Sequence, residues 1–206
     1  MDQTDIRKRI VEAAAGLFRT YGIRSVTMDS IAGNLGMSKR TIYEAFSDKD
    51  ELILSVLKMM AERQKLLIEK LISDSGNSIE AIFRLLEMSR DHFQAMSPAF
   101  FADLKKYHHE VIVKSSDISN MAEIRNNRKV IERGVEEKLF RDDIDPDIVN
   151  RCLFLLGQSI VDNDLFPYDQ FTRHEIIKNT FINYLRGIST PRGLKMIDEL
   201  ESKFIV

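Results

Sequence analysis

Residues 27–49 constrain the fold more than any other part of the chain, because they place two short helical segments on either side of one glycine. Thr27 and Ser38 each stand where a helix would begin, and their hydroxyl oxygens can accept a bond from a free backbone N–H. Gly36 suits the left-handed backbone that commonly ends a helix. The apolar residues of both segments recur at helical spacing and would close one small core: Ile31, Ala32, Leu35, Ile42, Ala45 and Phe46. The segment therefore predicts two short helices joined by a tight turn.

The second helix leaves a polar face outside this core, formed by Lys39, Arg40, Thr41, Tyr43 and Glu44. Two cations, a hydroxyl and a phenol on one short face are typical of a helix-turn-helix motif, whose second helix enters the DNA major groove. Ser38, Thr41 and Tyr43 can donate to phosphate oxygens. Lys39 and Arg40 are the candidates for reading bases, because either cation pairs well with guanine.

Other polar residues near this motif are candidates for flanking contacts. Thr27 can bond a phosphate at the start of the first short helix. Arg7, Lys8 and Arg9 could form an arm on the DNA backbone or in the minor groove. The alternative is that these three are solvated charges, which is the usual role of basic residues near a terminus.

Residues 7–57 resemble the N-terminal DNA-binding domain of the TetR family of bacterial transcriptional regulators. The residues that carry the resemblance are Phe18, Tyr21, Gly22, Thr27, Ile31, Ala32, Gly36, Ser38, Lys39, Thr41, Tyr43, Phe46, Lys49 and Leu52. Residues 134–149 match the family's junction between two later helices more loosely. Arg40 departs from the pattern, since many members carry glycine or another small residue there, so no operator sequence can be inherited. The resemblance implies that Lys49 contacts a flanking phosphate.

Composition agrees with an all-α fold. The chain has 206 residues, 44% of them apolar, with only 4 Pro and 9 Gly, and it lacks a useful alternating strand pattern. Its formal net charge is −2, so DNA binding must come from placed cations rather than from bulk charge. Cys152 is the single cysteine, which excludes an intrachain disulfide and suits a reducing cytoplasm. With neither a signal core nor an apolar run long enough to span a membrane, we expect a cytoplasmic protein without membrane partners.

Helical periodicity continues along the chain, and the clearest break in composition falls at residues 73–78. Besides the two short helices, the expected helices are residues 5–21, 48–72, 79–96, 98–113, 118–140, 146–165, 172–188 and 191–204. We expect residues 1–48 to form the helix-turn-helix DNA-binding domain, and residues 49–206 to form a helical domain for effector binding and dimerisation.

Two late helices carry strong apolar faces. Because a helix-turn-helix monomer reads only a few base pairs, operators are usually read by two-fold dimers. The resemblance assigns a homodimer interface, a four-helix bundle, to these helices, and the candidate residues are Leu153, Leu156, Ile160, Ile177, Phe181 and Leu185. The alternative is that the same stripes are intrachain core, and some of them must be.

The middle helices are rich in Met and Phe, which adapt to an apolar ligand but also fill cores. The resemblance favours a pocket for a small apolar or amphipathic effector. The candidate lining residues are Phe83, Met88, Phe93 and Phe101, with Arg84, His92 and His108 as polar groups that would orient the ligand.

Other patterns support neither a metal site nor catalysis. The run Asp143, Asp145, Asp147 opens like a calcium loop, but the glycine and the glutamate that such a loop needs are missing. His108 and His109 lack the i, i+4 spacing of a zinc helix. Cys152 lies among leucines and is expected to be a small core residue. We therefore expect no cofactor and no enzyme, but a ligand-responsive repressor; the alternative is a DNA-binding regulator controlled by a protein partner, with no small-molecule pocket.

Overall fold

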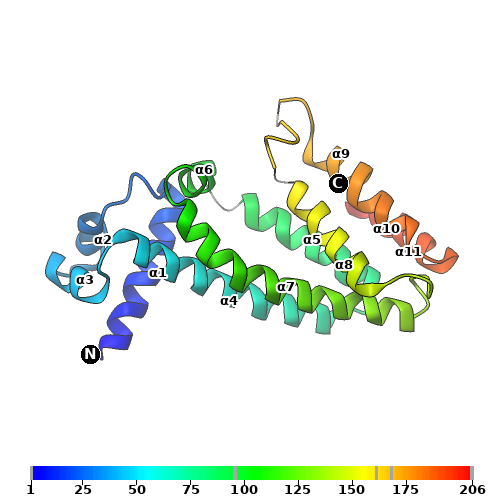
Figure 1. Cartoon of the computed structure of the whole chain (residues 1–206), viewed down its shortest axis with the longest axis horizontal. Coiled ribbons are helices and arrows are strands. Elements are labelled where there is room, and N and C mark those ends of the chain that lie inside the picture. Colours follow the sequence, from blue (N-terminus) through cyan, green and yellow to red (C-terminus); the bar gives the residue numbers. More distant parts are fainter. Residues whose placement is uncertain (1, 95–96, 161, 168, 205–206) are drawn as a thin grey trace. The chain divides into compact units, whose positions relative to one another are not determined.

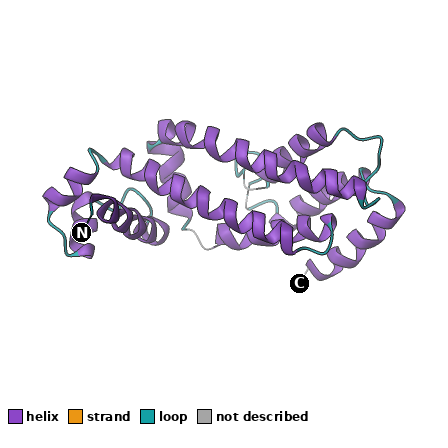
Figure 2. Ribbon diagram, turned by 90° about the horizontal axis from the view of Figure 1, so that it is seen from below, coloured by secondary structure: helices purple, strands orange, loops and turns teal. Residues whose placement is uncertain are grey.

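The computed structural model describes residues 2–94, 97–160, 162–167 and 169–204, and it confirms the all-α fold (Figures 1 and 2). The helices are α1 (Gln3–Tyr21), α2 (Met28–Leu35), α3 (Lys39–Ala45), α4 (Lys49–Asp74), α5 (Ser78–Gln94), α6 (Pro98–Tyr107), α7 (His109–Glu136), α8 (Pro146–Ser159), α9 (Arg173–Ile177), the π-helical turn η1 (Lys178–Ile182), α10 (Asn183–Gly187) and α11 (Pro191–Phe204). Among the described residues there is no β-strand, and one isolated antiparallel bridge joins Phe140 to Ser189.

The chain divides into two compact units, each with its own hydrophobic core. The first, called here the N-terminal unit, comprises Met1–Leu66 and Ser89–Met121, and the second, the C-terminal unit, comprises Leu67–Met88 and Ala122–Val206. The helices α4, α5 and α7 contain residues of both units. The predicted functional boundary between residues 48 and 49 stays a prediction.

The core of the N-terminal unit fixes the positions of α2 and α3. Its fully buried members include Ile10, Ala14 and Phe18 of α1, Ile31 of α2, Ile42 of α3, Phe46 and Leu52. These are the apolar positions that recur at helical spacing in the sequence. Because α1, α2 and α3 contribute to one core, burial of their apolar faces determines which side of α3 remains exposed.

The caps predicted for the two short helices are present. Thr27 Oγ1 accepts a bond from Ser30 N at 3.1 Å, and Ser30 Oγ accepts from Thr27 N at 2.9 Å, which completes a capping box. Ser38 Oγ accepts from Thr41 N at 3.1 Å at the start of α3. Gly36 has φ 62°, the left-handed conformation that ends α2. Local hydrogen bonding therefore sets both ends of the turn between α2 and α3.

The helices α6 and α7 differ from the prediction at three of their ends. The helix expected to continue to residue 113 ends at Tyr107, and α7 begins at His109 rather than at residue 118. At this break His108 Nδ1 lies 2.7 Å from Asp50 Oδ1 on α4, a tertiary contact that local sequence does not reveal. Further on, α7 ends at Glu136 instead of residue 140, because Lys138 adopts φ 57° and the chain turns there.

Two later helices also differ from the prediction. The helix expected over residues 146–165 ends at Ser159. The helix expected over residues 172–188 is present as three consecutive segments, α9, η1 and α10, in which η1 is a π-helical turn. A single π-turn inserts one extra residue into the helical repeat and shifts the exposed face beyond it. The final helix, over residues 191–204, has the predicted bounds.

Among the described residues, no helix combines the length and the apolar character that a membrane span needs.

Candidate nucleic-acid interface

The outward face of α3 carries the residues predicted to read DNA bases, and both cations are well exposed. The side chain of Lys39 is 62% exposed and that of Arg40 is 86% exposed. Tyr43, one turn after Lys39, is also exposed, and the Lys39 ammonium lies 5.9 Å from its ring centroid. Because the opposite side of this seven-residue helix is buried through Ile42 and Ala45, the polar face points into solvent, where a duplex can reach it.

Each cation on this face is paired with a carboxylate. Lys39 Nζ lies 2.8 Å from Asp29 Oδ2 at the start of α2, and Arg40 Nε lies 2.7 Å from Glu44 Oε1 one turn further along α3. The hydrogen bond and charge of Asp29 raise the pKa of Lys39, and those of Glu44 raise the pKa of Arg40. Both groups therefore stay cationic near neutral pH. Water screens such exposed pairs, so a base edge or a phosphate can replace the carboxylate at little cost.

The hydroxyl groups at the start of α3 form a local pair. Ser38 Oγ and Thr41 Oγ1 lie 2.9 Å apart, and either can be the donor. Since only one of the two hydroxyl hydrogens is needed for this bond, the other remains available for a phosphate oxygen. Thr27 Oγ1 accepts from a backbone N–H and so keeps its own hydrogen as well. The predicted phosphate contacts of these three residues are compatible with this geometry and stay predictions.

Lys49 has a different environment from the cations of α3. Its Nζ donates to the carbonyl oxygen of Ile23 at 2.6 Å and lies 5.9 Å from the ring centroid of Phe18. Partial burial lowers its pKa, although the nearby Asp103 and Asp50 act in the opposite direction. The side chain thus ties the start of α4 to the loop after α1. To make the predicted phosphate contact, the ammonium would either use another of its three N–H groups or give up the bond to Ile23.

Arg7, a member of the proposed basic arm, is also held by its own unit. It donates to the carbonyl oxygen of Ala45 at the end of α3, and its Nη2 lies 2.8 Å from Glu51 Oε1. Its guanidinium stacks over the ring of Phe46, with 4.1 Å between the guanidinium carbon and the ring centroid. The hydrogen bond from Arg7 lowers the pKa of Glu51, which also accepts from Ser47 N. Arg7 therefore fixes the turn between α3 and α4.

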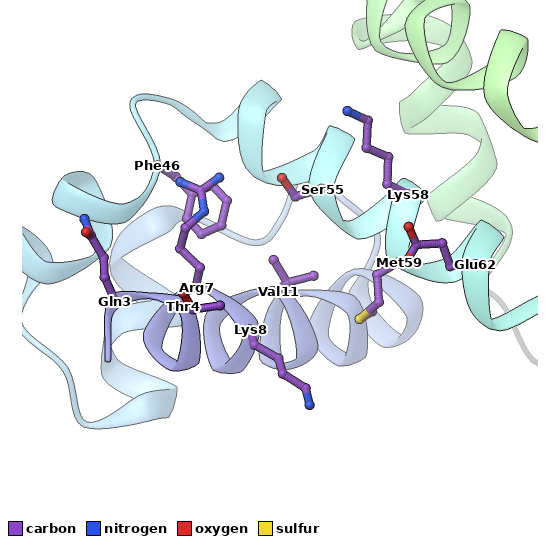
Figure 3. Close-up of a pocket in the computed structure, with 10 residues that line it drawn as sticks. All are labelled: Gln3, Thr4, Arg7, Lys8, Val11, Phe46, Ser55, Lys58, Met59 and Glu62. Atoms are coloured by element: carbon purple, nitrogen blue, oxygen red, sulfur yellow. The ribbon is translucent and has the colours of Figure 1, made fainter. Parts of the chain in front are cut away.

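A surface cavity of about 620 Å³ lies beside these contacts, between α1 and α4 (Figure 3). Val11, Phe46 and Met59 give it an apolar floor, while Lys8 and Lys58 extend from opposite sides with their ammonium groups pointing away from each other. None of the predicted effector-binding residues lines this cavity.

The predicted effector-binding residues of the C-terminal unit have partners inside that unit. Phe83 is 3% exposed and belongs to its core, and Met88 is partly buried. Arg84 Nη1 donates to Ser75 Oγ at 3.1 Å and lies 3.8 Å from Glu80 Oε1. These contacts are those of core and turn residues, and a ligand-binding role for them stays a prediction.

The remaining predicted effector-binding residues lie elsewhere in the chain. Phe101 and His108 belong to the N-terminal unit. Phe101 is 37% exposed and packs edge-on against Phe100, with ring centroids 5.5 Å apart, while His108 contacts Asp50. The side chains of His92 and Phe93 lie outside the described residues. A ligand-binding role for these residues stays a prediction.

Most of the predicted dimer-interface residues are buried within their own chain. Leu153, Ile160, Ile177, Phe181 and Leu185 are at most 8% exposed and belong to the core of the C-terminal unit, and Leu156 is partly buried against it. Their role in a dimer stays a prediction, and the geometry favours the intrachain alternative.

The sequence pattern did not single out two apolar residues on the outer face of α8. Ile148 is 61% exposed and Leu155 is 62% exposed. They are seven residues apart, so they lie on the same helix face two turns from one another. Exposed apolar positions of this kind cannot be separated from core positions by periodicity alone.

Comparison with known proteins agrees with the geometry of α2 and α3. Residues 10–56 match the family described as bacterial regulatory proteins, tetR family. The chain is 24% identical over 161 residues to the HTH-type transcriptional repressor KstR2 of Mycobacterium tuberculosis, covering 71% of this chain and 75% of that protein. It is 25% identical over 183 residues to YvaF of Bacillus subtilis, an uncharacterized HTH-type transcriptional regulator, covering 88% of this chain and 95% of that protein. A solved gamma-butyrolactone receptor (ArpA-like protein) has a TM-score of 0.63 at 23% identity, covering 98% of this chain and 100% of that one.

A helix-turn-helix motif with an exposed cationic second helix, followed by a helical C-terminal unit, defines a DNA-binding transcriptional regulator. The chain carries the N-terminal DNA-binding domain of the TetR family of bacterial transcriptional regulators.

The exposed phenol of Tyr43 generates a prediction. Tyr43→Phe removes one donor to a phosphate, so affinity should fall on the order of tenfold for every duplex, because a phosphate contact carries no sequence information. Titrating a labelled operator and a scrambled duplex of equal length measures the two losses. Tyr21→Phe, at a tyrosine that is 63% exposed but outside the motif, is the matched control and should change neither affinity. A loss confined to the operator would contradict the phosphate assignment.

Proposed function

We propose that this regulator binds a palindromic operator as a homodimer, represses transcription there, and is released by a small-molecule effector. The observation that carries the DNA-binding part is the outward face of α3, where Arg40 and Lys39 are exposed beside Tyr43. A repressor role is supported by the similarity to a relative named as a transcriptional repressor. Two such helices about one turn of DNA apart, ~34 Å, would read the two half-sites of a palindrome.

The proposed dimer rests on the outer face of α8. Ile148 and Leu155 give this face an apolar stripe that would be costly to leave in water. Beside it, Tyr184 on α10 is hydrogen-bonded to Cys152 on α8, and burial, together with Cys152, raises the pKa of Tyr184 to about 12. The two helices are therefore packed against each other near this face. The occupant we propose is the same face of a second copy, as a two-fold interface requires.

The interface generates the second prediction. Leu155→Arg places a charge on the exposed stripe, so it should convert a dimer into monomers that keep their helical content, because the side chain contributes little to the intrachain core. Light scattering at micromolar concentration, together with circular dichroism, measures assembly and folding in the same samples. A Leu155→Arg protein that remains dimeric would contradict the interface.

Two further variants separate an effect on assembly from an effect on folding. Leu67→Arg makes the same change at a leucine on α4 that is 59% exposed, and it should leave the dimer intact. Phe181→Arg places the charge at a residue that is 8% exposed, and it should reduce helical content and thermal stability.

The proposed effector is a small apolar or amphipathic molecule. Its support is the abundance of Phe in α5 and α6, together with Met88, and the similarity in fold to a protein titled a gamma-butyrolactone receptor. A coupling of ~1–3 kcal/mol between the two sites would weaken DNA binding about 5- to 150-fold.

The effector generates the third prediction. A compound that binds the folded chain should raise its melting temperature by mass action, with ~2.7 kcal/mol of stabilisation at a hundred times its Kd. By linkage, the same compound should release a bound operator duplex. Thermal melting against a panel of amphipathic small molecules, followed by DNA competition, measures both effects. If compounds that raise the melting temperature leave DNA affinity unchanged, the release mechanism is wrong; if no compound shifts melting, control by a protein partner is favoured.

A further inference from the structure

Arg40 and Glu44 form an arrangement on α3 that leaves part of each side chain available to DNA. The single described bond between them joins Arg40 Nε to Glu44 Oε1 at 2.7 Å. Because the Nε–H is used in this bond, the two terminal nitrogens of the guanidinium remain at its outer end. Glu44 likewise keeps its second carboxylate oxygen. Both side chains are well exposed, at 86% and 59% respectively.

A carboxylate on a DNA-reading face needs a reason, because duplex DNA carries about one negative charge per ~1.7 Å of its axis. A glutamate there repels the phosphates of any sequence. Cytosine is the base for which a carboxylate is the usual major-groove partner, since its N4 amine donates and the carboxylate accepts. Glu44 would therefore lower affinity for most sequences and restore it where a cytosine amine is within reach. Asp29 is the other carboxylate of this surface. Its hydrogen-bond donor, Lys39, lies on the neighbouring helix, so this pair joins α2 to α3, whereas Glu44 and Arg40 lie on the same helix.

We propose that Glu44 determines sequence specificity in two ways. Its Oε1 holds the guanidinium of Arg40 end-on, so that the terminal nitrogens bond O6 and N7 of a guanine. Its second oxygen accepts a hydrogen bond from the N4 amine of a nearby cytosine. The inference rests on the proposed function, in which α3 enters the major groove.

The spacing of the two residues suits two neighbouring base pairs. Residues four apart on a helix have Cβ atoms about 5–6 Å apart, and base pairs follow each other every ~3.4 Å along the axis. The guanine read by Arg40 and the cytosine read by Glu44 therefore lie one or two base pairs apart in each half-site. The spacing argument does not specify the strand, so the cytosine can lie on the same strand as the guanine or on the opposite one.

Selection of preferred duplexes from a random DNA pool tests this inference with the full-length protein. Glu44→Gln retains an oxygen that can accept from Arg40 Nε, but its amide matches adenine rather than cytosine. We expect this variant to keep the guanine and to replace the cytosine by adenine, with a change in base preference of about 5- to 100-fold at that position. Glu44→Ala removes both functions, so it should weaken the preference for the guanine as well as for the cytosine.

A matched control comes from the other compact unit, where Arg128 Nε lies 2.9 Å from Glu132 Oε1 with the same i, i+4 spacing. Glu132→Gln should leave the selected consensus unchanged. An unchanged consensus for Glu44→Gln would overturn the inference. A loss of the guanine preference alone in both Glu44 variants would also overturn it, since Glu44 would then act only through Arg40. If the wild-type protein enriches no motif, the proposed function itself fails, which is a distinguishable result.

Discussion

Every functional feature of the N-terminal unit depends on the burial of one side of a very short helix. The seven residues of α3 are too few to form a stable helix in isolation, because nucleation is costly and each added residue contributes little. The helix persists because Ile42 is fully buried and Phe46, just after it, is 1% exposed in the shared core with α1 and α2. Burial of each such side chain contributes roughly 1.5–3 kcal/mol. Arg7 and Lys49 then fix the two ends of the α3–α4 connection through backbone carbonyl groups.

This constraint determines how the protein can recognise DNA. The exposed surface of α2 and α3 presents the cations Lys39 and Arg40 together with the carboxylates Asp29 and Glu44, so its charges nearly cancel. The whole chain has a formal charge of −2. Non-specific attraction to the phosphate backbone is therefore weak, and affinity must come from contacts that match a particular sequence. Lys39 would exchange its partner Asp29 for a base or a phosphate only where the duplex offers a suitable replacement, whereas Arg40 would keep its bond to Glu44 in the complex we propose.

Features that depend on local interactions could be predicted from the sequence. Features that depend on contacts with residues distant in the sequence could not. The caps at Thr27 and Ser38 and the left-handed Gly36 follow from residue type and spacing alone, and they fix the motif. The helix breaks at His108, whose ring contacts Asp50, 58 positions away, and α7 ends close to Lys138, which adopts a conformation usually left to glycine. Arg7 was a candidate for DNA contact because of its charge, and Lys49 because of the family resemblance, but their bonds to distant carbonyls become visible only in the fold. Periodicity found the apolar faces of α8 and of the helical stretch formed by α9, η1 and α10, but it could not separate core residues such as Phe181 from the exposed Leu155.

The central claim is that α3 enters the major groove of two half-sites, and methylation interference on a selected operator tests it most directly. Dimethyl sulfate methylates guanine N7 in the major groove and adenine N3 in the minor groove, so one experiment compares both grooves. Because O6 and N7 are the guanine atoms that Arg40 would bond, methylated N7 should block binding at guanines in two clusters about one helical turn apart. Methylated adenine N3 between them should have little effect. Interference confined to adenine N3, or the absence of interference at any guanine N7, would contradict the account.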